Sequence, residues 1–160
     1  MKKLTLLALI FLCLVTAACT KHNCCVPPPI TPYIGADKNT VKWTGEATAE
    51  KQGTDTLLII GSKTEERLIM RLKFTGEGIY TFQNTQAFYF TTIGGDVFTS
   101  EYIVDETAAS TLTVTDYNET SRLASGTYSL TLKRNYPNPT SAYPQKVQFV
   151  NGMFHVYLPK

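Results

Sequence analysis

The chain has 160 residues, enough for one domain with a single hydrophobic core. Two of its 15 basic residues, Lys2 and Lys3, lie in an expected signal peptide, so the remainder has 13 Lys and Arg against 13 Asp and Glu. This neutral remainder has no basic run, which argues against nucleic acid as a partner and against adhesion to anionic lipid by charge alone.

The first 18 residues have the pattern of a secretion signal. A basic start is followed by a mostly apolar run of 15 residues, from Leu4 to Ala18, that ends in small residues before Cys19. A transmembrane helix needs about 20 apolar residues, so this run is too short for one. We therefore expect residues 1–18 to be removed, with an uncleaved membrane anchor as the alternative.

The residues before Cys19 resemble the lipobox of bacterial lipoproteins, in which the signal is cut before a cysteine that then carries diacylglycerol and an acylated amine. Ala17 and Ala18 fit that pattern, and the looser lipoboxes of Bacteroidota-type lipoproteins accept Thr16. Two or three acyl chains hold a protein durably on a membrane. The resemblance implies lipidation of Cys19, with ordinary signal cleavage after Ala18 as the alternative.

Residues 19–36 are predicted to be a tether between this anchor and a single domain at 37–160. Four prolines within Val26–Pro32 favour polyproline II. At about 3.1 Å per residue, the stretch from Thr20 to Tyr33 could span on the order of 40 Å.

The cysteines lie before the predicted domain. Cys24 and Cys25 belong to the tether, so the domain has no cysteine and must hold together by core packing. His22, Cys24 and Cys25 do not supply the two separated ligand pairs that structural zinc sites use. We expect no metal and no cofactor.

Beyond the tether, apolar and polar residues alternate with a period of two, and Gly, Asn, Asp and Pro interrupt the pattern. This indicates an all-β domain. In 67–74, for example, Leu68, Met70, Leu72 and Phe74 share one face and are expected in the core. The expected strands are 41–49, 56–62, 67–74, 78–82, 87–93, 97–104, 110–117, 126–133, 145–150 and 153–158.

Nine or ten short antiparallel strands favour a two-sheet β-sandwich. A closed or partly open lipocalin-like β-barrel is the alternative, because alternation alone does not separate the two. No helical period and no internal repeat is visible after the signal.

The last two strands are predicted to form a hairpin, because Asn151-Gly152 is the preferred filling of a two-residue type I′ turn. That turn pairs Gln148 with His155 on the polar face. It also places one apolar set on the core face. The set is Val147, Phe149, Phe154, Val156 and Leu158.

The domain offers little material for catalysis. Its only histidine, His155, is expected on the polar face, and no nucleophile elbow, metal-protease motif or phosphate loop is present. Glu101 and Asp105 lie four residues apart on one predicted strand, and a glycosidase uses two carboxylates. A carboxylate-dependent hydrolase is therefore kept as a less favoured hypothesis, behind a non-enzymatic module.

Aromatic residues are the better binding candidates. Trp43, the only tryptophan, could be a core anchor or a sugar-stacking platform. The loop 134–144 contains three prolines beside Tyr136 and Tyr143, and rigid aromatic side chains make efficient contacts. We predict a candidate binding surface formed by Trp43, Tyr136 and Tyr143.

The domain resembles a family of small, uncharacterised all-β lipoproteins of Bacteroidota-type bacteria over residues 41–158. The resemblance rests on short motifs that occur in the same order. They are Trp43-x-Gly45-x-Ala47, Gly78-Ile79-Tyr80, Ser125-Gly126-Thr127-Tyr128 and Val147-Gln148-Phe149-Val150-Asn151-Gly152-Met153-Phe154.

The resemblance implies a fold and a location but no activity. Exported surface lipoproteins of such bacteria carry acidic residues after the lipidated cysteine, whereas Thr20-Lys21-His22-Asn23 follow here. We therefore expect the periplasmic face of the outer membrane. Asp55-Thr56-Leu57 is similar to the O-glycosylation sequon of these bacteria, which makes Thr56 a possible site.

The favoured interpretation is a membrane-anchored envelope lipoprotein that binds a glycan or an envelope protein, or supports an assembly. A barrel that encloses a small apolar ligand is the alternative.

Overall fold

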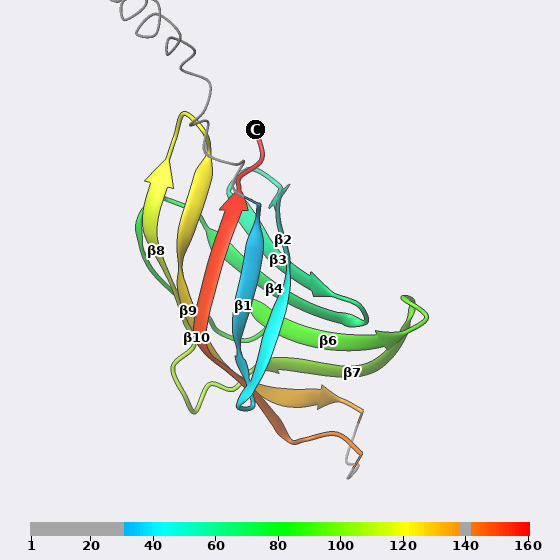
Figure 1. The fold of residues 1–160 in the computed structure, drawn as a ribbon. Coiled ribbons are helices and arrows are strands. Elements are labelled where there is room, and N and C mark those ends of the chain that lie inside the picture. Colours follow the sequence, from blue (N-terminus) through cyan, green and yellow to red (C-terminus); the bar gives the residue numbers. More distant parts are fainter. Residues whose placement is uncertain (1–30, 138–141) are drawn as a thin grey trace, which may run out of the picture. The chain divides into compact units, whose positions relative to one another are not determined.

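A computed structural model describes residues 31–137 and 142–160 of the chain, and these form ten β-strands and no helix (Figure 1). None of the described residues forms a helix with the length and hydrophobicity needed to cross a membrane. The predicted signal peptide, Cys19 and most of the predicted tether lie outside the described residues. The strands are β1 (Tyr33–Lys38), β2 (Val41–Gln52), β3 (Thr56–Lys63), β4 (Glu66–Lys73), β5 (Gly78–Thr81), β6 (Ala87–Ile93), β7 (Val97–Val104), β8 (Thr111–Asn118), β9 (Leu123–Tyr136) and β10 (Lys146–Tyr157).

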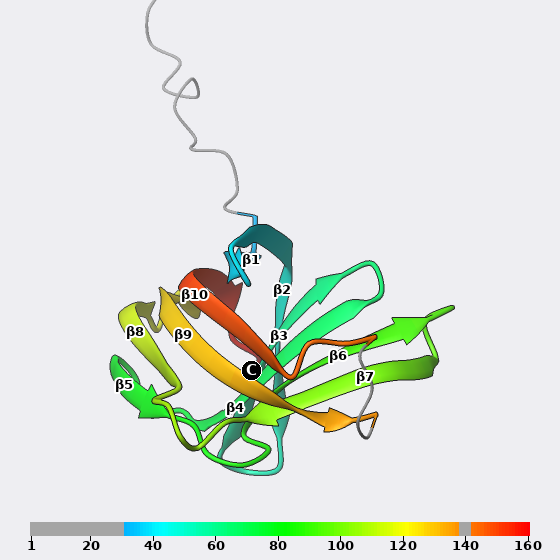
Figure 2. The same ribbon diagram turned by 90° about the horizontal axis from the view of Figure 1, so that it is seen from below.

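All ten strands belong to one antiparallel sheet that curves back on itself (Figures 1 and 2), which confirms the predicted all-β class. Its order is β10-β1-β2-β3-β4-β6-β7-β9-β8-β5, and β9 also pairs with β10. The ladder therefore returns to its start through β9. The first part of β9 pairs with β8 and its last part with β7, so this strand joins the closed ladder to the β8–β5 extension.

The core lies between strands that are not neighbours in the sheet. Trp43 of β2 and Tyr89 of β6 both contact Phe149 of β10, with ring centroids 5.4 and 5.3 Å apart. The sheet thus packs on itself across a layer of side chains, as in a sandwich. Because large aromatic rings fill this layer, the packing counts against an interior site for a small apolar ligand.

The strand β1 begins inside the stretch that we predicted to be tether. Ile34 and Gly35 pair with both β2 and β10, and Ile34 is fully buried. Asn39 and Thr40 then form a two-residue turn with positive φ at both positions, 47° and 73°. Two positive φ values are the mark of the type I′ turn. The nearby prolines and Gly35 concealed this strand in the sequence.

The predicted hairpin at Asn151-Gly152 is wrong. The strand β10 runs through both residues from Lys146 to Tyr157, pairing with β9 on one edge and β1 on the other. His155 lies opposite Tyr33 and Ser125 and not opposite Gln148. Asn151 has a positive φ of 53°, as expected, but it lies in a β-bulge where both registers shift.

The bulge explains why the core prediction for this segment is nevertheless correct. One extra residue in a strand reverses the alternation of its faces, just as a two-residue turn does. Before the bulge the odd-numbered residues are buried, and after it the even-numbered ones are. All five predicted residues are buried, namely Val147, Phe149, Phe154, Val156 and Leu158.

Candidate functional site

The structure does not bring the predicted binding residues together. Trp43 is 1% exposed and belongs to the core, so its assignment to a binding surface is wrong. Tyr136 is 50% exposed at the end of β9, and Tyr143 is half-buried in the following loop, where its carbonyl oxygen accepts a hydrogen bond from Arg134. A binding surface of these three aromatic side chains would need all of them on one exposed face, and the burial of Trp43 excludes it.

The carboxylates considered for hydrolysis have separate structural partners. Asn135 donates a 2.7 Å hydrogen bond to Glu101. Asp105 lies just beyond β7, is 3% exposed, and forms a 2.6 Å ion pair with Lys146. Hydrogen bonds from Lys146 and Thr107 lower the pKa of Asp105 to about 2. A general acid needs a raised pKa, so Asp105 is not suited to that role.

Asp105 instead belongs to the loop that bridges the two partners of β9. The backbone amide of Asp105 donates to the carbonyl oxygen of Thr131 over 2.9 Å, and the amide of Thr131 donates to the hydroxyl of Ser110 over 3.0 Å. These bonds satisfy Thr131 at the point where β9 changes from pairing with β8 to pairing with β7.

The two other candidates are His155 and Thr56. His155 stacks on Tyr33 with ring centroids 6.0 Å apart, and within the described part of the chain no three metal-ligating side chains come together. Thr56 is half-buried at the start of β3 and its hydroxyl lies 3.4 Å from a carboxylate oxygen of Asp55.

A closed polar network lies at one end of the core. Lys38 and the Tyr89 hydroxyl both donate to one carboxylate oxygen of Glu66, over 2.5 and 2.8 Å. Burial raises the pKa of Glu66, but these two hydrogen bonds outweigh it, so that pKa lies below its usual value. Burial and Glu66 together raise the pKa of Tyr89. Each group satisfies the others, so we assign the network to stability.

The feature that the sequence interpretation missed is a cluster of apolar side chains on the outer side of the sheet. It comprises Ile69 of β4, Phe88 and Phe90 of β6, and Phe98 and Ile103 of β7, and we call it the outer aromatic face. Phe98 is 53% exposed and the other four are half-buried. Soluble domains expose single apolar residues commonly, but contiguous apolar patches mark interaction sites.

The aromatic rings of this face form a continuous stack. Phe88 and Phe90 are nearly parallel, with centroids 6.1 Å apart, and Phe90 lies 4.9 Å from Phe98. The guanidinium of Arg71 covers the far side of Phe88 at 4.8 Å. Since side chains stand roughly perpendicular to a sheet, rings stacked in this way present their rims to solvent.

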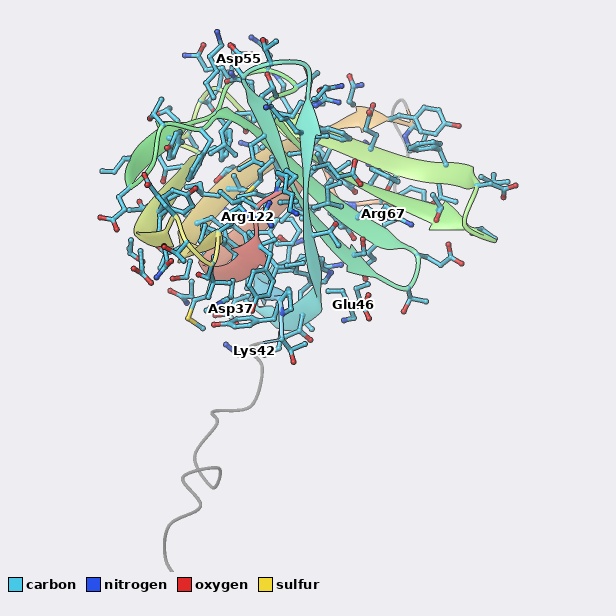
Figure 3. The ribbon with its side chains drawn as sticks, turned by 90° about the horizontal axis from the view of Figure 1, so that it is seen from above. Asp37, Lys42, Glu46, Asp55, Arg67 and Arg122 are labelled. Carbon is cyan, nitrogen blue, oxygen red and sulfur yellow. The ribbon has the colours of Figure 1, made fainter. Side chains whose placement is uncertain are left out.

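Strand pairing orders the face into rows. In one row, Arg67 of β4 lies opposite Phe90 of β6, which lies opposite Glu101 of β7, which lies opposite Tyr136 of β9. In the next row Ile69, Phe88 and Ile103 are neighbours. Directly opposed residues share a face of the sheet. Arg67 is labelled in Figure 3, and β6 and β7 are the next two strands of the sheet beyond its own strand, β4.

The sequence does contain a signal for this face. Four neighbouring strands each have apolar residues at consecutive positions, a pattern typical of strands covered on both faces. Elsewhere, as in β9 and β10, buried apolar residues alternate with exposed ones. The consecutive runs are Leu57–Ile60, Leu68–Met70, Ala87–Phe90 and Tyr102–Val104.

Comparison with known proteins gives one result. A family model described as a domain of unknown function, DUF6252, matches residues 30–157. No curated protein and no solved structure matches the chain.

Proposed function

The chain belongs to the DUF6252 family, and on that premise we propose that it is a lipid-anchored envelope protein that acts by binding a protein partner and not by catalysis. The observation that carries the proposal is a sheet segment, β3-β4-β6-β7, that has apolar side chains on both faces. The inner face packs in the core. The outer aromatic face is partly open to solvent, with Phe98 53% exposed, and its composition suits a partner.

A protein partner is favoured over a glycan by the geometry of the rings. A sugar stacks on the flat side of an aromatic ring, whereas Phe88 and Phe90 turn their flat sides toward each other. Rims of phenylalanine beside Arg67 and Arg71 are typical of protein interfaces, where aromatic residues and arginine are enriched.

The anchor half of the proposal rests on the sequence around Cys19. A neutral domain would gain little membrane affinity from charge, so acyl chains on Cys19 are what would hold it there. The absence of acidic residues in Thr20–Asn23 favours the periplasmic face of the outer membrane.

Two other functions receive less support. A small apolar ligand would need room that Trp43, Tyr89 and Phe149 already occupy. A hydrolase that uses Glu101 and Asp105 would need both carboxyl groups turned toward a substrate, whereas Asp105 is held by Lys146 and Thr107, and Glu101 by Asn135.

Photo-crosslinking in cells tests the binding proposal. A benzophenone amino acid in place of Phe98, in the full chain, is expected to give a discrete covalent product of higher mass after irradiation, because this position lies on the proposed interface. Ser129 is the matched control, since it is also exposed but lies on β9 away from the outer aromatic face.

Products are separated by electrophoresis and identified by mass spectrometry. The proposal requires a product at position 98 and none, or a much weaker one, at position 129. If neither position gives a product, or both give the same diffuse ladder, the outer aromatic face is not a binding surface.

A further inference from the structure

We propose that the partner of the outer aromatic face is a second copy of this chain. The inference rests on the proposed function, because it takes this face to be a binding surface, and it goes further by naming the occupant. The reason is that a basic and an acidic residue flank the face on opposite sides, so that two copies related by a two-fold axis would pair opposite charges.

The row through Phe90 has a cation on one side and a carboxylate on the other. Arg67 is the neighbour of Phe90 on β4, and Glu101 is its neighbour on β7. A two-fold axis that runs along β6 in the plane of contact places Phe90 of one copy against Phe90 of the other. The same rotation places Arg67 of each copy over Glu101 of the other.

The neighbouring row and the ends of the first row agree with this arrangement. The row Ile69, Phe88 and Ile103 is apolar throughout, so the rotation lays apolar side chains on apolar side chains. Beyond Arg67 the first row continues to Ser62 on β3, and beyond Glu101 it continues to Tyr136 on β9. The rotation brings the Ser62 and Tyr136 hydroxyls to the same side of the contact.

The symmetry is of the common isologous kind, in which one patch serves both copies. Two sheets that pack face to face do so with their strands roughly aligned, as this axis requires. The neutral charge of the chain after its signal, 13 basic against 13 acidic residues, adds no net repulsion between copies. Anchoring to one membrane would raise the effective concentration of the copies for each other.

Charge reversal provides the test, in the full chain with the benzophenone amino acid at position 98. The parent chain is expected to give a product of twice its own mass that contains only this chain. Arg67→Glu places two carboxylates together in each symmetric contact, and Glu101→Arg places two cations together. Each single variant is expected to lower the yield of that product roughly tenfold, because two contacts are affected at once.

The double variant Arg67→Glu with Glu101→Arg restores opposite charges and is expected to recover most of the yield. This recovery also controls for folding, since a variant that merely unfolds the chain would not be rescued by a second substitution. A double variant that stays as low as the single ones would overturn the inference.

The failure of this inference differs from the failure of the proposed function. If position 98 crosslinks to another protein and gives no product of twice the chain mass, the face binds a different partner and the second copy is ruled out. If position 98 gives no product at all, the face is not a binding surface and both proposals are overturned.

Discussion

Replacement of Trp43 by alanine is expected to lower the free energy of unfolding by about 3–5 kcal/mol, the cost of truncating a large buried aromatic residue. Trp43 is 1% exposed and packs edge to face on Phe149. Removal of the indole would also leave an empty space beside Gly61. The ring and this glycine are in close contact, because a Cβ added at Gly61 would lie only 2.8 Å from the Trp43 ring. Urea unfolding followed by circular dichroism measures the change.

Trp43→Phe is the matched control for this loss. The buried indole nitrogen has no hydrogen-bond partner among residues 31–137 and 142–160, so phenylalanine gives up volume but no hydrogen bond to these residues. We expect it to lose less than half as much stability as Trp43→Ala. If Trp43→Ala instead leaves stability unchanged, Trp43 does not anchor the core, and the surface role predicted from the sequence has to be considered again.

Cys19→Ser is expected to abolish incorporation of an alkyne-tagged fatty acid into the chain. The proposal assigns all acyl chains to the sulfur and amine of this one residue, so a hydroxyl at position 19 leaves no acceptor. The measurement is in-gel fluorescence after metabolic labelling in a bacterium that processes lipoproteins.

The nearby pair Cys24 and Cys25 supplies the matched control. The variant with both changed to serine is expected to label as strongly as the parent chain. Label that persists in Cys19→Ser, or a parent chain that takes up none, would show that residues 1–18 are an ordinary signal or an uncleaved anchor.

Alternation in the sequence was enough to predict which residues of a strand face the core. Leu68, Met70 and Leu72 are buried as expected, and Phe74 is partly buried against the core. The apolar residues on either side of Asn151 are also buried, although the hairpin is a continuous bulged strand. A turn of two residues and a bulge of one extra residue both reverse the alternation. The buried positions therefore did not distinguish the two.

The pairing partners settle what alternation left open. In a hairpin, the second half of β10 would pair with its first half. In the structure, both halves pair with β9 on one edge and with β1 on the other. Such long-range pairing has no local signal in the sequence. The strand β1 was missed for a related reason, because its register is set by β2 and β10 and its own residues are bordered by proline.

The binding surface was predicted from residue type, and this explains the error. Tryptophan and tyrosine are frequent at interfaces, but Trp43 is fully buried, and residue type alone does not predict that burial. The phenylalanines of β6 were not considered as binding residues, although both faces of this strand have apolar side chains. A strand with apolar residues on both faces needs a cover for its second face, and that cover can be a binding partner.

The most direct test of the central claim is whether the outer aromatic face is covered in the cell. Hydroxyl-radical oxidation of Phe98 is measured in intact cells and in the purified, diluted full chain, with Tyr157 as the internal reference. In the domain by itself the two residues are comparably exposed, at 53% and 42%. The account predicts that the ratio of Phe98 to Tyr157 oxidation falls severalfold in cells, and an unchanged ratio would contradict it.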